Sequence, residues 1–189
     1  IFSVMEQNDT SIPLLITNYH VLENAVAGFV ELHIAEKGLP SEKSIRIQFN
    51  ESIINGNKLG NLDLIAIPLA STLNELKQRG INIFYRTVDQ NMLPKEEQIE
   101  YFAAIEDITF IGYPSGLYDS VNKLPIIRQG ITATPIWNQF NGENVFLIDA
   151  GVFPGSSGSP VFIYNHGSYP TKDGIAIGNR LLFIGVISE

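Results

Sequence analysis

Short runs in which hydrophobic and polar residues alternate dominate the chain. In residues 28–35 and 44–50, apolar side chains recur at every second position, which is typical of a strand with one buried face. Residues 12–16 form a further apolar run of strand length. Between such runs lie Gly, Pro and Asn residues that favour turns, as in residues 37–42 and 55–57. This pattern predicts strands joined by short turns.

Two segments depart from the alternation. Residues 71–79 predict a short helix, which a hydroxyl side chain caps at its start and Gly80 ends. The apolar run of residues 62–69 predicts a strand that carries Asp63 at its beginning. From Ile108 onward, strands and Gly/Pro turns alternate again. The chain therefore predicts an antiparallel all-β fold, with the helix and the mixed stretch after it bridging two halves.

The composition fits a globular protein with a packed core. The chain has 189 residues, enough for one or two small domains, and 44% of them are hydrophobic. No apolar run approaches the roughly 20 residues of a membrane helix. The net charge of −8, without a Lys/Arg cluster, disfavours a nucleic-acid partner. The absence of cysteine excludes disulfides and a thiol nucleophile, and it is compatible with a reducing cytoplasm while leaving the compartment open.

Residues 154–160, with the sequence Pro-Gly-Ser-Ser-Gly-Ser-Pro, carry the clearest chemical signal. Two glycines allow a tight loop around Ser157, whose hydroxyl needs an adjacent base to become a nucleophile. His20 is a candidate base. Asp63, costly to bury unpaired beside an apolar run, is a candidate orienter of that base. Taken alone, a serine in such a loop or a histidine beside a strand is more often structural. The three together favour nucleophilic catalysis.

These segments resemble those of trypsin-like serine proteases. The loop at Ser157 is similar to the family's Gly-x-Ser-Gly-x-Pro motif, and Thr-Asn-Tyr-His-Val around His20 is similar to its Thr-x-x-His-Val segment. The order of His20, Asp63 and Ser157 along the chain is the trypsin order. Other segments resemble the bacterial HtrA-like branch of the family; they are residues 110–116, 129–133, 148–155 and 183–188.

The resemblance implies a fold of two packed antiparallel β-barrels with the active site between them. The first barrel would comprise residues 1–85 and carry His20 and Asp63. The second would comprise residues 86–189 and carry the nucleophile Ser157 with its oxyanion loop. The predicted helix and the stretch after it would then join the two barrels.

The same resemblance implies a serine endopeptidase that hydrolyses peptide bonds through an acyl-enzyme intermediate. His20 would take the proton of Ser157, and Asp63 would hold the imidazole in the required tautomer. The backbone N–H groups of Gly155 and Ser157 would form the oxyanion hole. No cofactor is expected, and three scattered histidines without a cysteine disfavour a metal site.

Further residues receive roles from the resemblance. Ser188 matches a serine that hydrogen-bonds the catalytic aspartate in many relatives, so we expect it to support Asp63. Gly151, Val152 and Ile187 would bound the substrate pocket. None of these three is acidic, which argues against a preference for Lys or Arg and favours a small or apolar residue before the cut.

The chain also departs from the digestive enzymes. Ser156 stands where they carry an aspartate that pairs with a freshly cleaved N-terminus, so activation by that route is not expected. The chain stops before the family's closing strands, and we expect the natural protein to be longer at both ends. Expected partners are a protein or peptide substrate and either a regulatory domain of the same chain or an activating partner. Two alternatives stay open: a protease gated by such a partner, and a catalytically silent, protease-like interaction module.

Overall fold

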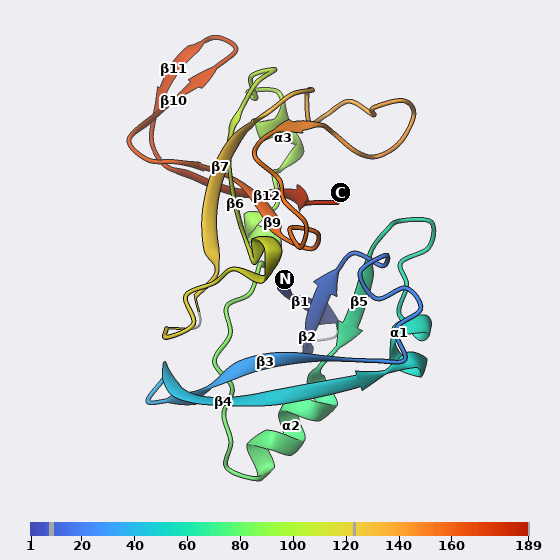
Figure 1. The fold of residues 1–189 in the computed structure, drawn as a ribbon. Helices are drawn as coiled ribbons and strands as arrows, with labels where there is room; N and C mark the ends of the chain where they lie inside the picture. Colours follow the sequence, from blue (N-terminus) through green and yellow to red (C-terminus); the bar gives the residue numbers. More distant parts are fainter. Residues whose placement is uncertain (8–9, 123, 189) are drawn as a thin grey trace. The chain divides into compact units, whose positions relative to one another are not determined.

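The computed structural model describes residues 1–7, 10–122 and 124–188, without the side chains of residues 5–11. Its contacts divide the chain into two compact units, Ile1–Asp89 and Gln90–Glu189, near the predicted boundary between residues 85 and 86 (Figure 1). Strands make up 43% of the chain, and the helices are few and short. The structure therefore confirms a mostly β protein.

Over its described residues, unit 1 (Ile1–Asp89) contains two antiparallel sheets and two helices. The strands of the first sheet, in the order β1-β2-β5, are β1 (Phe2–Gln7), β2 (Thr10–Thr17) and β5 (Ile65–Pro68). The second sheet is the long hairpin of β3 (Ala27–Glu36) and β4 (Leu39–Asn50), and the helices are α1 (Glu51–Gly56) and α2 (Ala70–Gln78). The strands expected at residues 12–16, 28–35 and 44–50 lie within β2, β3 and β4.

Four local predictions need correction. The strand expected over residues 62–69 is shorter, because β5 spans only Ile65–Pro68, so Asp63 lies in the loop before the strand and not at its beginning. The turn expected over residues 37–42 is only two residues long, because Lys37 and Gly38 both adopt a positive φ that matches the twist of a hairpin, and β4 starts directly afterwards. The turn expected at residues 55–57 is wrong, since α1 extends through Gly56. The helix α2 forms where it was expected, but no side chain caps its start.

The core of unit 1 is formed by the buried side chains of these strands and helices. The buried side chains are Leu32 of β3, Ile47 and Phe49 of β4, Ile54 of α1, Ile65 and Ile67 of β5, Leu69, and Leu76 of α2. Burying a side chain of this size stabilises the fold by about 1.5–3 kcal/mol. The core holds β5 in place, and with it the loop that precedes β5 and carries Asp63.

Unit 2, Gln90–Glu189, is built on a five-stranded antiparallel sheet in the order β12-β9-β6-β7-β8. Its strands are β6 (Asp107–Gly112), β7 (Ile126–Thr132), β8 (Ile148–Asp149), β9 (Pro160–Asn165) and β12 (Arg180–Val186). A separate hairpin of β10 (Ser168–Thr171) and β11 (Gly174–Ile177), the short helix α3 (Glu96–Ile99) and the 3-10 turns η1 (Gln90–Met92) and η2 (Pro114–Gly116) complete the unit. Over the residues described, no sheet of either unit closes into a barrel.

A buried ion pair ties together distant parts of unit 2. Arg180 Nη2 lies 2.6 Å from Glu106 Oε2, and the two side chains are only 8% and 1% exposed. Glu106 also accepts the N–H of Ala103 at 2.7 Å, and Arg180 Nε donates to Asn165 at 2.9 Å. Removing one partner of such a pair typically costs about 3–5 kcal/mol, because the other charge is left buried and unpaired.

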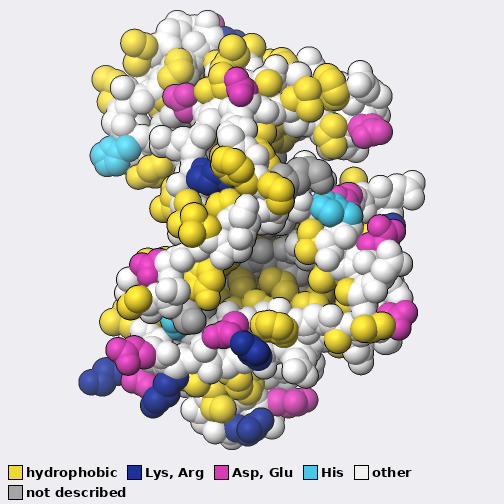
Figure 2. Space-filling view, viewed as in Figure 1, with side chains coloured by type: hydrophobic (Ala, Val, Ile, Leu, Met, Phe, Trp, Pro, Cys, Tyr) yellow, Lys and Arg dark blue, Asp and Glu magenta, His cyan; other side chains and the backbone are white. Residues whose placement is uncertain are grey.

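No helix in the part of the chain that the structure describes is long and apolar enough to cross a membrane. On the face shown in Figure 2, Lys and Arg side chains stand singly or beside Asp and Glu instead of forming one continuous basic surface.

Candidate active site

His20 and Asp63 lie together in unit 1. His20 Nδ1 is 2.6 Å from Asp63 Oδ2, and the backbone N–H of His20 donates to Asp63 Oδ1 at 2.9 Å. With the carboxylate ionised, Nδ1 carries the proton, so Nε2 keeps its lone pair. The two side chains are 37% and 40% exposed. An ionised Asp63, which can only accept, would thus hold the imidazole in the tautomer that a general base requires.

The pairing of two strands brings these residues together. Thr17 at the end of β2 pairs with Ile65 at the start of β5, so the residues after Thr17 run beside those before Ile65. The backbone N–H of Tyr19 donates to Asp63 O at 3.2 Å and continues the contact beyond the sheet. The position of Asp63 therefore follows from the sheet register.

Asn18 is a site residue that the sequence did not reveal. Its side chain is 2% exposed, and its Nδ2 donates to both Asp63 O at 3.1 Å and Asp63 Oδ2 at 3.2 Å. Asn18 thus fixes the carboxylate that contacts His20. Its place two residues before His20 was the only local signal, and a lone asparagine there reads as part of a turn.

Ser157 lies in unit 2, in a loop that regular hydrogen bonds hold to β12 and its continuation. Gly158 N donates to Ile187 O at 3.0 Å, and Ile187 N donates to Ser159 O at 2.9 Å. Gly155 and Gly158 adopt φ values of 89° and 85°, which favour glycine. The two glycines that the sequence singled out are therefore the residues that turn the chain around Ser157.

The other side of the loop packs on η2. Ser115 N donates to Pro154 O, and a Cβ added to Gly155 would lie 3.1 Å from Tyr113 O and 3.3 Å from Ser115 N. A side chain at Gly155 would thus meet both a strained φ and crowded backbone atoms. This close approach fixes the segment that supplies the first of the two expected oxyanion donors.

Ser156, which precedes the candidate nucleophile, is 1% exposed. Its Oγ donates to Phe153 O at 2.6 Å and accepts the N–H of Phe153 at 3.3 Å. Arg128 Nη1 on β7 also donates to this oxygen at 3.3 Å. Where the digestive enzymes have a carboxylate, this chain has the hydroxyl of Ser156. It bonds to the backbone of Phe153 in the same loop and accepts a hydrogen bond from Arg128.

The residues predicted to bound the substrate pocket differ in their surroundings. Val152 packs against a buried cluster that includes Ile187, which is only 5% exposed, so Ile187 serves the core of unit 2. Gly151 is exposed and borders Arg128. Ser188, predicted to support Asp63, is exposed, and its role stays a prediction.

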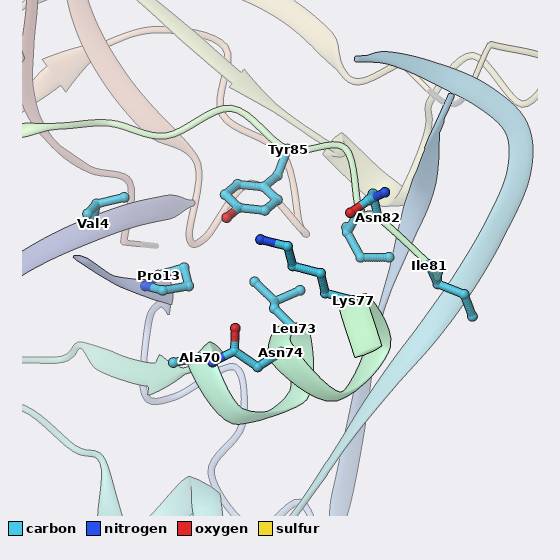
Figure 3. A pocket seen from close by; sticks show the side chains of 10 residues that line it. Val4, Pro13, Ala70, Leu73, Asn74, Lys77, Ile81, Asn82 and Tyr85 are labelled. Atoms are coloured by element: carbon cyan, nitrogen blue, oxygen red, sulfur yellow. The ribbon is translucent and has the colours of Figure 1, made fainter. Parts of the chain in front are cut away.

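Among the described residues, the candidate catalytic side chains neither form a metal-binding group nor line the cavity beside α2. Within the described ranges, no group of three or more His, Cys, Asp or Glu side chains could hold a metal ion. Unit 1 has a cavity of about 300 Å³ beside α2, where Lys77 extends toward Tyr85 above Leu73 and Pro13 (Figure 3). Neither His20 nor the other candidate catalytic residues line it.

Comparison with known proteins identifies the family. The model of the trypsin-like peptidase domain matches residues 3–168, so the chain belongs to that family. No curated protein and no solved structure matches it significantly. Membership supports a serine peptidase, a hydrolase that acts on proteins.

Proposed function

We propose that the protein is a serine endopeptidase whose catalytic triad is His20, Asp63 and Ser157. The observation that carries the proposal is the 2.6 Å contact between His20 Nδ1 and Asp63 Oδ2, in a chain of the trypsin-like peptidase family. Ser157 Oγ attacks the carbonyl carbon of the peptide bond while His20 Nε2 accepts its proton. That proton passes to the leaving amine, and water then hydrolyses the acyl-enzyme with the same nitrogen as base.

The oxyanion of the tetrahedral intermediate is bound by the N–H groups of Gly155 and Ser157. The positive φ of Gly155 and its close approach to Tyr113 support this role, because they leave the loop little freedom to rearrange. Losing one such donor typically slows catalysis by about 10²–10³-fold.

We also propose the architecture of the family for this chain, with one β-rich unit for each of the family's two β-barrels and both units supplying catalytic residues, although the sheets of the described residues are open. The division into units at Asp89 supports two separate cores, one for each barrel. The segments at residues 110–116, 129–133, 148–155 and 183–188 support the bacterial HtrA-like branch within the family. Gating by an adjoining domain or a partner is the form of regulation that this branch suggests.

Labelling of Ser157 by a fluorophosphonate tests the proposal. A competent triad gives one adduct per chain by intact mass, and peptide mapping assigns that adduct to Ser157. Ser157→Ala abolishes it, and His20→Ala slows it by about 10²–10⁴-fold, the usual contribution of a general base. Ser168→Ala, which changes an exposed serine of β10, serves as the matched control and labels normally.

The absence of any adduct would contradict a constitutively active protease. Repeating the assay with a regulatory domain or partner added, and with and without peptide substrate, then separates the two alternatives. An adduct that appears only under these added conditions identifies a gated protease. No adduct under either condition identifies a silent interaction module.

A further inference from the structure

A cation lies against the nucleophile loop in unit 2. The guanidinium carbon of Arg128 is 4.9 Å from the ring centre of Phe110, which is buried, and 4.8 Å from that of Phe153 on the loop. Arg128 Nη1 donates to Ser156 Oγ, one residue before Ser157. The charge thus lies against two aromatic rings, one of them on the loop that carries the candidate nucleophile.

This arginine lacks a carboxylate among the described residues. Arg128 Nη2 is buried and has no hydrogen-bond partner there, and no ion pair of Arg128 is found in the same ranges. Arg180 is the other arginine of unit 2 that stacks on an aromatic ring, that of Tyr169. Unlike Arg128 in these ranges, it also forms an ion pair, with Glu106. A buried donor without an acceptor typically costs about 1–3 kcal/mol, and more when charged. Arg128 therefore has the capacity to bind an acidic group that the unit itself does not supply.

The unpaired nitrogen faces a position without a side chain. A Cβ added to Gly151 would lie 3.6 Å from Arg128 Nη2 and 3.8 Å from the ring of Phe153. Gly151 thus places no side chain of its own against Nη2, which is buried. The Phe153 ring, which stacks on the guanidinium, is 55% exposed and belongs to a segment outside any strand or helix.

We propose that Arg128 determines specificity by binding the carboxylate of a glutamate or aspartate immediately before the cleaved bond. This inference rests on the proposed endopeptidase activity. An arginine fork binds a carboxylate through two parallel hydrogen bonds, and Nη2 supplies a donor for such a pair. The carboxylate enters beside Gly151 once the Phe153 ring turns aside, and its charge replaces the missing counter-ion of the guanidinium.

The location favours this substrate residue over more distant ones. Arg128 reaches the loop at Ser156, and the acyl group on Ser157 carries the side chain of the residue before the cut. Gly151, which the sequence assigned to the same pocket, borders Nη2 directly. The uncharged residues Gly151, Val152 and Ile187 favoured a small or apolar side chain, and Arg128 changes that expectation to an acidic one.

Matched peptides test the inference. The substrates differ only in the residue before the cleaved bond, which is Glu, Gln, Ala or Leu. The protein should cleave the Glu peptide with a kcat/KM at least about 10-fold above that of the Gln peptide, because only Glu brings a charge. Arg128→Met should lower kcat/KM for the Glu peptide by about 100-fold and for the Ala peptide by less than about 3-fold, whereas Arg128→Lys should retain part of the preference. Arg46→Met is the matched control, since Arg46 also stacks on a phenylalanine ring but pairs with Glu31 on the hairpin of unit 1.

Two results would overturn the inference while leaving the proposed function intact. One is equal cleavage of the Glu and Gln peptides by the unmodified protein. The other is an equal loss for all four peptides in Arg128→Met, which would make Arg128 a structural anchor of the loop.

A binding measurement covers the case in which no activity is found. Ser157→Ala is titrated by calorimetry with two product peptides that end in Glu or in Gln. We expect tighter binding of the Glu peptide and loss of that difference when Arg128→Met is added. Fluorophosphonate labelling decides the proposed function separately. Equal binding of the two peptides would contradict the proposed role of Arg128 in specificity, even if the protein is inactive.

Discussion

The two carboxylate oxygens of Asp63 have different tasks. Oδ1 accepts the backbone N–H of His20 and fixes the chain, whereas Oδ2 contacts Nδ1 and sets the tautomer of the ring. In Asp63→Asn an amide nitrogen that faces Nδ1 would force the proton onto Nε2, and the base would be lost. We expect kcat/KM to fall by about 10⁴-fold, and the melting temperature to fall as well, because the new amide nitrogen would also face the donor Asn18 Nδ2. Peptide cleavage and thermal unfolding measure the two effects.

Asp173→Asn, which changes an exposed aspartate in the turn between β10 and β11, is the control for loss of a negative charge. It should cleave as the unmodified protein does. Undiminished cleavage by Asp63→Asn would mean that Asp63 does not orient a catalytic histidine.

At the residue scale, local motifs in the sequence point to His20, Asp63 and Ser157; the structure brings His20 and Asp63 together, and the catalytic role of all three stays a prediction. The contacts of Asn18 and the role proposed for Arg128 have no such motif, because they depend on residues far along the chain. Arg128 lies 28 residues before Ser156 and reads as an ordinary polar position of an alternating strand. Its contact with two rings depends on strand pairing and loop path, which spacing alone does not encode.

At the scale of elements, the pairing of β7 with β8 fixes the position of β8, the strand that precedes the nucleophile loop in the sequence. Ile131 of β7 pairs with Asp149 of β8, and Thr132 pairs with Ile148. Gly130 is the residue of β7 that directly precedes this pairing. A Cβ on Gly130 would lie 2.6 Å from both Asp149 O and the Cβ of Ala150, so Gly130→Ala must displace the backbone of β8. We expect a loss of about 1–3 kcal/mol in the free energy of unfolding, together with slower labelling of Ser157. Urea unfolding and labelling rates report these two changes.

Gly56→Ala is the matched control, because Gly56 ends α1 and a Cβ there has nothing within 4 Å. An alanine in that helix should stabilise unit 1 by about 0.4–1 kcal/mol and leave labelling unchanged. Equal behaviour of the two glycine variants would show that β8 does not position the loop.

The elements also show where sequence patterns succeed and fail. The hairpin of β3 and β4 could be predicted because each strand buries one face, as Ile47 and Phe49 do. The helix α1 could not, because Asn-Gly-Asn at residues 55–57 reads as a turn. Its stability comes from Asn50, which caps the first turn by accepting the N–H of Ile53, and from Ile54, which is 1% exposed. Burial of one side chain in the core thus outweighed the local preference.

At the scale of the whole molecule, the proposed catalytic groups are divided between the two units. His20 and Asp63 belong to Ile1–Asp89, whereas Ser157 and Arg128 belong to Gln90–Glu189. The described contacts that anchor the Ser157 loop, namely those with Ser115, Arg128 and Ile187, come from unit 2 itself. The proposal therefore predicts that unit 2 can keep the loop but cannot activate the serine.

Expression of unit 2 alone tests this division. Circular dichroism and NMR establish whether it folds, and the rate of fluorophosphonate labelling at Ser157 is compared with that of the whole chain and of its His20→Ala variant. We expect the folded unit and the His20→Ala chain to label at similar rates, each about 10²–10⁴-fold below the whole chain, because both lack the base. Labelling of unit 2 at the rate of the whole chain would contradict the role of His20 as the base that activates Ser157. If unit 2 does not fold alone, the His20→Ala variant of the whole chain, which keeps both cores, provides the test. Labelling of this variant at the normal rate contradicts the triad, and slow labelling supports it.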